Sequence, residues 1–345
     1  MNAAARPLRP SPAGAVLRAD RSSNMPDAAK LRSAFDPMRL QADLSALHNY
    51  APLRQPGRYH DGEWVGHTLR SAGGRISARP SMPGLRDYEE TRLLEHAPYM
   101  REVLATLACP QLCVRVLCLP PGGVIREHVD DVFGFWSGIL RLHIPIVTHP
   151  RVNFMLAGRR RHWRPGELWY GDFSLPHSVR NESDVIRAHL VIDVLVNEFI
   201  LSQFPDARDL QAYTPAPVII EIEESRLAEY ACELVLPTAL LAALWPKALK
   251  RLWARKQSPP APGLAVCLRA SANRLVAWIG TKPFVSLAPI GDDVFMLCGW
   301  TAGVLVRLSR TGGRVSAAQL RVRTNRSTRG TGPKNIETHF DLAVL

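Results

Sequence analysis

The sequence predicts a mainly β protein with flanking helices, in which a jelly-roll domain is followed by a small antiparallel β-barrel-like domain. Between residues 113 and 198, eight short β-type runs are separated by turn residues, which is typical of a double-stranded β-helix, or jelly roll. After a proline-containing linker at 204–217, more short strands follow, with a turn pair at Gly312-Gly313. A chain of 345 residues with 46% hydrophobic content is long enough for two packed cores.

Three segments are predicted along the chain. Residues 1–33 are rich in Ala, Pro, Arg and Ser without an apolar period, so we expect a disordered extension, and the true start codon stays open. Residues 34–212 form the jelly-roll domain with its core at 113–198, beginning with a helix that Asp36 caps. Residues 213–345 form the second β domain, with a helical insert near 238–256.

Charge and cysteine usage limit the classes of partner. The formal charge of +12 is spread over the chain, without a basic helix or a zinc-finger motif, which disfavours nucleic acid and favours anionic small molecules. The six cysteines have no CxxC spacing and are expected to be reduced. No run is apolar enough for a membrane helix and no signal peptide is visible, so we expect a cytoplasmic protein without a membrane partner.

A metal-binding pattern lies within the jelly-roll core. His128 and Asp130 are two positions apart, which places them on one face of an extended strand, and His177 follows 49 residues after His128. Two imidazoles and one carboxylate form the facial triad of non-haem iron(II) oxygenases, which leaves three coordination positions open. Two of these positions suit a bidentate 2-oxo acid and the third suits O2.

Arg187 lies ten residues after His177 on the last strand of the core. Its guanidinium can pair with the far carboxylate of 2-oxoglutarate through two charge-assisted hydrogen bonds. The alternative is an arginine that faces outward, which the alternating apolar residues Ile186, Ala188 and Leu190 disfavour. His189 lies two residues after Arg187, so it faces the same side of the strand and is a further candidate for cosubstrate binding.

Several motifs then resemble the aspartyl/asparaginyl β-hydroxylase family, especially its bacterial branch with cis-proline hydroxylases. They are LPPGGVIREHVD, RLHIPIVT, PGELWYGDFSLPHSVRNES and IRAHLVIDV, within about residues 114–196. The resemblance implies that His128 and His177 are iron ligands and that Arg187 anchors 2-oxoglutarate. It also implies that Arg141 and His143 contact the cosubstrate or the active site.

The resemblance further implies hydroxylation of an aliphatic carbon in an amino acid, free or within a peptide, with release of succinate and CO2. The animal members of the family lack the carboxylate ligand, whereas Asp130 completes the triad here. Its presence also argues against a halogenase, which needs that position for chloride. A substrate carboxylate would find Arg115, Arg126 or Arg141 near the mouth of the barrel.

Other interpretations stay open. Arg141 and His143 can be polar groups whose hydrogen bonds are satisfied inside the barrel. Asp193 is either a partner of the site or a charge at the end of a strand, and Trp169 can belong to the core packing. The C-terminal segment resembles a lipocalin-like module and is assigned no chemistry; it can shape substrate access or mediate dimerisation. The rival function is a catalytically silent, cupin-like small-molecule binding protein. The substrate, the carbon attacked, the stereochemistry and the oligomeric state are not readable from the sequence.

Overall fold

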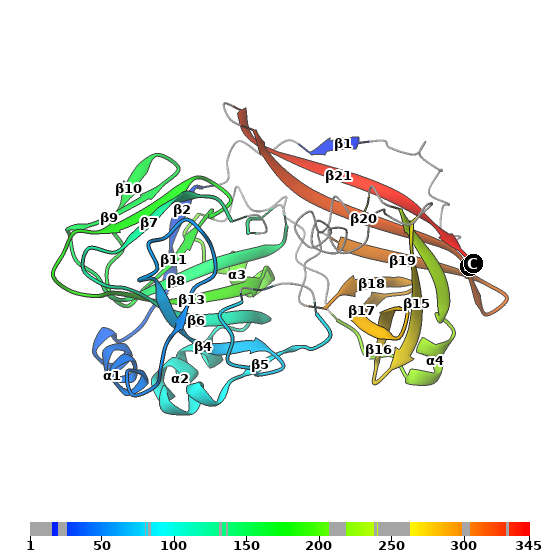
Figure 1. Cartoon of the computed structure of the whole chain (residues 1–345), viewed down its shortest axis with the longest axis horizontal. Coiled ribbons are helices and arrows are strands. Elements are labelled where there is room, and N and C mark those ends of the chain that lie inside the picture. The colour runs from blue at the N-terminus through cyan, green and yellow to red at the C-terminus, as the bar shows by residue number, and fades with distance from the viewer. Residues whose placement is uncertain are drawn as a thin grey trace.

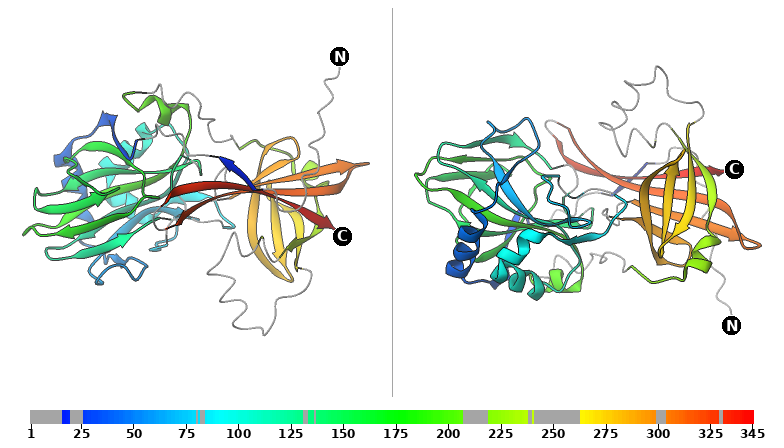
Figure 2. Two further views of the ribbon diagram at one scale, coloured as in Figure 1. Left: turned by 90° about the horizontal axis from the view of Figure 1, so that it is seen from above. Right: turned by 60° about the horizontal axis from the view of Figure 1, so that its bottom comes forward.

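The computed structural model describes most of the chain. The described residues are 16–19, 26–79, 81, 84–130, 133–135, 137–206, 219–237, 240, 263–298, 304–328 and 331–345. Figure 1 shows two β structures side by side, one from each half of the chain. Figure 2 shows the same arrangement from two further directions. Among the described helices, none has the length and apolar character needed to cross a membrane.

The first β structure is a jelly roll, and its core contains all eight predicted strands. These are β6 (Gln111–Leu119), β7 (Val124–His128), β8 (Ile139–Val147), β9 (Val152–Leu156), β10 (Arg159–Arg161), β11 (Glu167–Gly171), β12 (His177–Asn181) and β13 (Arg187–Leu195). A small sheet has the order β10-β9-β12-β7. The large sheet has the order β2-β11-β8-β13-β6-β4-β3, with β5 paired to β4.

Short elements before the core extend and cover the large sheet. They are β3 (Leu53–Arg54), β4 (Val65–Ala72), β5 (Tyr88–Glu90), helix α1 (Pro37–Leu47), the 3-10 helix η1 (Arg92–His96) and α2 (Pro98–Thr106), with α3 (Glu198–Ser202) after the core. The predicted cap of α1 is confirmed, because Asp36 Oδ1 accepts hydrogen bonds from the backbone N–H groups of Met38 at 2.8 Å and Arg39 at 3.2 Å.

The expectation of disorder over residues 1–33 is wrong at its C-terminal end. Residues Ala28–Ala34 form strand β2, which pairs antiparallel with β11 at the edge of the large sheet. An edge strand of this kind is held by backbone hydrogen bonds, and Leu31 is the one side chain of β2 that is buried. Its composition therefore gave no apolar period to recognise.

The large sheet is buried on both faces, but the two faces differ in chemistry. Alternate residues of β6, β8 and β13, such as Val116, Leu142 and Leu190, join the apolar core that the helices also line. The residues between them point to the other side, toward the small sheet, and include six buried polar groups: Arg115, Arg141, His143, Arg187, His189 and Asp193. Burying so many polar groups is costly unless they are paired with one another or bind a ligand, so this interior has the lining expected of a functional site.

The second β structure is an antiparallel barrel, as the sequence predicted. Its strands are β14 (Cys232–Pro237), β15 (Gly263–Ser271), β16 (Arg274–Ile279), β17 (Lys282–Gly291), β18 (Val294–Leu297), β19 (Val304–Thr311), β20 (Arg314–Thr328) and β21 (Thr331–Val344). The pairing of β20 with β21 and of β21 with β14 closes the ring. Helix α4 (Glu224–Ala228) precedes the barrel, and β1 (Val16–Ala19) pairs with β21.

Two predicted features of the second half are not visible. Most of the linker at 204–217 and nearly all of the helical insert at 238–256 lie outside the described residues. The domain boundary at residue 212 therefore stays a prediction. The barrel encloses its own apolar core, which contains residues such as Leu268, Phe295 and Val306.

Candidate metal centre

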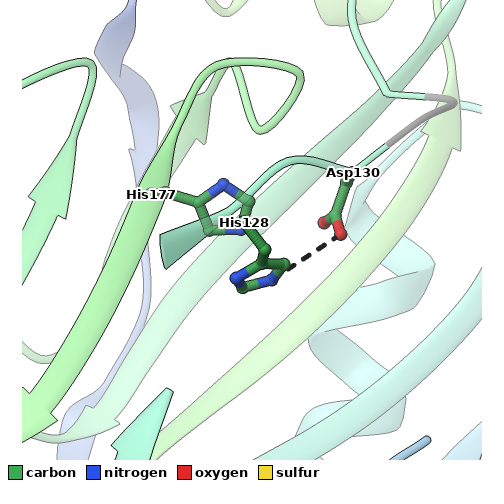
Figure 3. A group of neighbouring side chains, drawn as sticks. All are labelled: His128, Asp130 and His177. Atoms are coloured by element: carbon green, nitrogen blue, oxygen red, sulfur yellow. Dashed lines mark ion pairs between the residues drawn. The ribbon is translucent and has the colours of Figure 1, made fainter. Parts of the chain in front are cut away.

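The three predicted metal ligands converge between the two sheets (Figure 3). His128 ends β7 and His177 begins β12, and the antiparallel register pairs these two residues directly, so their ring centroids lie 4.1 Å apart. Asp130 lies two residues beyond β7, where its backbone N–H donates to the Phe173 carbonyl at 2.8 Å. The distance from His128 Nε2 to Asp130 Oδ1 is 3.9 Å, and one donor atom from each residue lies within 4.8 Å of the others. A first-row metal with ligand distances of roughly 2.0–2.2 Å fits such a set after small side-chain movements.

Both imidazoles present the same nitrogen to the centre. The Nδ1 atoms of His128 and His177 each lie 2.9 Å from a backbone carbonyl, of Arg126 and Leu175 respectively. A proton on Nδ1 satisfies that carbonyl and leaves the Nε2 lone pair for a metal. Burial lowers the pKa of His128 and lowers the pKa of His177 to about 4, so both rings are in the neutral form that binds metals.

The carboxylate of Asp130 is held by Arg141. Arg141 Nη1 donates to Asp130 Oδ2 at 2.6 Å, while its Nε and Nη2 donate to the two oxygens of Asp193 at 2.8 and 3.1 Å. Although burial opposes the charge, Arg141 and the two imidazoles lower the pKa of Asp130 below its usual value. Oδ2 is therefore occupied by Arg141, and Oδ1 remains directed toward His128. Asp193, which the sequence left ambiguous, is a direct partner of the site.

Arg187 lies in the same interior and forms no ion pair among the described residues. It is 4% exposed, and its Nη2 lies 3.2 Å from His189 Nδ1. Burial lowers the pKa of Arg187 to about 10. The pocket beside it is lined by Thr148, Val152, Phe154, Arg161, His162, Trp163, Arg187 and His189. A buried guanidinium without a carboxylate partner is a strong candidate for binding an anionic ligand.

His143 and His189 complete the polar lining. Their Nδ1 atoms lie 3.2 Å apart, and His143 Nε2 is buried without a hydrogen-bond partner in the described part of the chain. His143 stacks on Phe173 with ring centroids 4.7 Å apart. The sequence predicted that both histidines contact the cosubstrate. In the structure His189 lies next to Arg187, and His143 lies between His189 and the ring of Phe173.

The sequence did not identify Tyr59 as a residue of the site. Its ring stacks on the His128 imidazole, with centroids 3.8 Å apart and an interplanar angle of 12°. The segment reaches the metal centre because His60 forms an isolated antiparallel bridge with Ile125 of β7. No spacing along the chain links Tyr59 to the triad.

The buried histidines predict a pH dependence of stability. Burial first, and nearby cations second, hold the pKa values of His143 and His189 well below the usual 6.5, and burial lowers that of His177 to about 4. The unfolded chain binds these protons near pH 6.5. The contribution of the neutral histidines to the free energy of unfolding is therefore complete above that pH and is lost as the pH falls toward 4. Each histidine contributes at most about 1.4 kcal/mol per pH unit.

We expect the free energy of unfolding of the metal-free protein to fall clearly between pH 7 and pH 5. Urea titrations in the presence of a chelator measure this. The His143→Gln variant, which removes one titrating group, is expected to have a shallower dependence. Equal unfolding free energies at pH 7 and pH 5 would contradict the burial of neutral imidazoles.

A jelly roll with this donor set has the architecture and ligand types of non-haem iron oxygenases. Residues 37–196 match the family model of "Aspartyl/Asparaginyl beta-hydroxylase", and this part of the chain is aspartyl/asparaginyl β-hydroxylase-like. The match contains every residue proposed above for the metal and the cosubstrate.

Two characterised relatives are proline hydroxylases. The chain is 27% identical over 179 residues to L-proline cis-4-hydroxylase of Rhizobium meliloti (strain 1021), which covers 50% of this chain and 60% of that protein. It is 24% identical over 170 residues to L-proline cis-3-hydroxylase 2 of a Streptomyces species, covering 46% and 57%. The matched part thus spans less than two thirds of either relative. Among solved structures, a Pseudomonas putida prolyl-4-hydroxylase aligns with 13% identity and a TM-score of 0.31, over 49% of this chain and 92% of that one.

Proposed function

We propose that the protein is an iron(II)- and 2-oxoglutarate-dependent dioxygenase that hydroxylates an aliphatic carbon of an amino acid, free or within a peptide. The observation that carries the proposal is the convergence of His128 Nε2, His177 and an Asp130 oxygen in the same interior as the buried Arg187, which forms no ion pair among the described residues. The similarity to proline hydroxylases supports an amino acid as the substrate class.

The residues around the centre would act by binding and orientation. Bound iron and 2-oxoglutarate would supply the oxidising chemistry, with O2 as oxidant and succinate and CO2 as products. His128, Asp130 and His177 would hold the metal from one side and leave the opposite positions for cosubstrate and oxygen. Arg187 would hold the far carboxylate of 2-oxoglutarate, and the aromatic groups around it, such as Phe154 and Trp163, would exclude water from that ion pair.

Arg115 supports a substrate that carries a carboxylate. It is 4% exposed on the inner face of β6, and its Nη1 donates to Gln55 Oε1 at 2.8 Å. Its Nε is buried without a hydrogen-bond partner, and it has no ion pair among the residues that the structure describes. The positive charge of Arg115 helps to lower the pKa of Asp130, which places it close to the metal centre. An α-carboxylate of an amino acid would satisfy this guanidinium within reach of the metal.

The decisive experiment is a screen of amino acids and dipeptides with the full-length protein, iron(II), ascorbate and 2-oxoglutarate. Formation of succinate together with a mass gain of one oxygen in one of these compounds supports the proposal. Binding of amino acids without turnover, in a protein that takes up no iron(II), would instead support the silent binding protein.

The Arg115→Met variant is expected to raise the KM for the amino-acid substrate by about 10- to 100-fold, because it removes hydrogen bonds to a charged group worth about 1.5–3 kcal/mol. The KM for 2-oxoglutarate should stay close to that of the wild type. Steady-state kinetics measure both constants. The matched control is Arg126→Met, which changes an exposed arginine on β7 whose guanidinium donates to the Arg58 carbonyl. A larger effect of Arg126→Met would assign the substrate carboxylate to the rival arginine.

A further inference from the structure

The barrel and the jelly roll share an apolar cluster. From the jelly roll it contains Tyr88, Leu112, Cys113, Phe133, Ile139 and Leu195, and from the barrel Met296, with Ile290 and Leu305 packed against it. Strand β18 shows how the barrel contributes, since Phe295 and Leu297 point into the barrel core while Met296 between them points out. This outer face of the barrel is thus covered by the chain's own jelly roll.

The first route from this cluster to the metal centre is Phe133. Phe133 is 3% exposed and lies three residues after the ligand Asp130. The guanidinium carbon of Arg141 lies 3.8 Å from the centroid of the Phe133 ring. The same ring belongs to the cluster with Met296, so the barrel supports the surface on which Arg141 rests.

The second route is Ser81. Its hydroxyl donates to Asp193 Oδ2 at 2.8 Å and accepts a hydrogen bond from the Cys113 backbone N–H at 3.1 Å. Three residues later, Gly84 is bonded to the barrel: its N–H donates to the Cys298 carbonyl at 3.0 Å, and its carbonyl accepts from the Ser286 N–H at 3.1 Å. The segment that orients Asp193 is therefore attached to β17 and to the end of β18.

Both routes end at Arg141. Its guanidinium donates hydrogen bonds to Asp193 on one side and to Asp130 on the other. We propose that the C-terminal barrel is a supporting element of the metal centre, which fixes Arg141 through Phe133 and Ser81 so that Arg141 holds Asp130 in its ligating position. The proposal rests on the function proposed above and adds a role for the barrel, to which no chemistry is assigned.

The physical reason is the cost of a buried charge network that is only partly satisfied. Arg141 carries its charge on a long side chain in a water-poor interior, where its partners must be held in place for their hydrogen bonds to offset the desolvation. Loosening either support allows Arg141 to shift, and Asp130 then shifts with it. Met296 and Ser81 act through Arg141 and are positioning residues.

The test uses the full-length protein with two variants, Met296→Ala and Ser81→Ala. For each variant we expect the Kd for Co(II), used as an iron(II) probe under anaerobic conditions, to rise roughly 2- to 30-fold, in the range of couplings carried by packed networks. The absorption spectrum of bound Co(II) should change as well, because the position of the carboxylate ligand changes. The conservative Met296→Leu variant should restore both values.

The matched control is Phe295→Leu, which changes the adjacent residue on the same strand but inside the barrel core. It is expected to lower the Tm while leaving the Kd and the spectrum of Co(II) unchanged. Wild-type Kd and spectra in both Met296→Ala and Ser81→Ala would overturn the proposal, and so would a change in Phe295→Leu as large as theirs. A wild-type protein that binds no Co(II) or iron(II) would instead overturn the proposed function itself.

Discussion

Replacing Arg187 with lysine is expected to weaken 2-oxoglutarate binding by about 10- to 100-fold while metal binding persists. Lysine keeps the positive charge but loses the planar fork that matches a carboxylate through two parallel hydrogen bonds. Hydrogen bonds to charged groups are worth about 1.5–3 kcal/mol, which sets this range. In this interior the change is not screened by water, because Arg187 is 4% exposed and has no acidic neighbour that forms an ion pair with it among the described residues.

The measurement is a titration of the metal-loaded protein with 2-oxoglutarate in the absence of oxygen, together with a separate metal titration. The matched control is Arg180→Lys, an exposed arginine on the neighbouring part of the jelly roll in β12. This control should leave both affinities unchanged. Unaltered 2-oxoglutarate affinity in Arg187→Lys would remove Arg187 from the cosubstrate site.

Replacing His177 with alanine is expected to weaken metal binding by at least about 100-fold and to reduce hydroxylation to background. Even residues that only orient a ligand typically account for 10- to 100-fold in metal affinity, so loss of a ligand itself should exceed that effect. Folding should be preserved, because the His177 side chain makes one hydrogen bond among the described residues, to the Leu175 carbonyl, and its neighbour Phe173 can relax into the space.

Metal titration and circular dichroism of the same sample separate loss of the site from loss of the fold. His339→Ala is the control, since His339 is an exposed histidine of the barrel that pairs with Glu337. Metal affinity within a few-fold of wild type in His177→Ala would show that the three converging side chains are not the metal site.

The eight core strands and the parity of the polar residues on them were predictable from the sequence. Side chains alternate along a strand, so Arg187 and His189 had to share a face whatever the strand paired with. The same rule put His128 and Asp130 on one side, even though Asp130 lies just beyond the end of β7. The antiparallel, barrel-like character of the C-terminal domain was also predictable, from its strand runs and its Gly312-Gly313 turn, whereas the closure of the barrel is seen only in the structure.

Only the tertiary structure decided which of these groups meet and what the second barrel touches. The partners of Arg141 are Asp130 and Asp193, and the second of these lies on β13, which the sheet register places opposite Arg141 of β8. Tyr59 reaches His128 through one bridge to β7, and Met296 of the barrel joins the apolar cluster of the jelly roll that contains Phe133. Alternation within a strand is a local property of the backbone, whereas these contacts depend on register and on domain packing, which are set by the free energy of the whole folded chain.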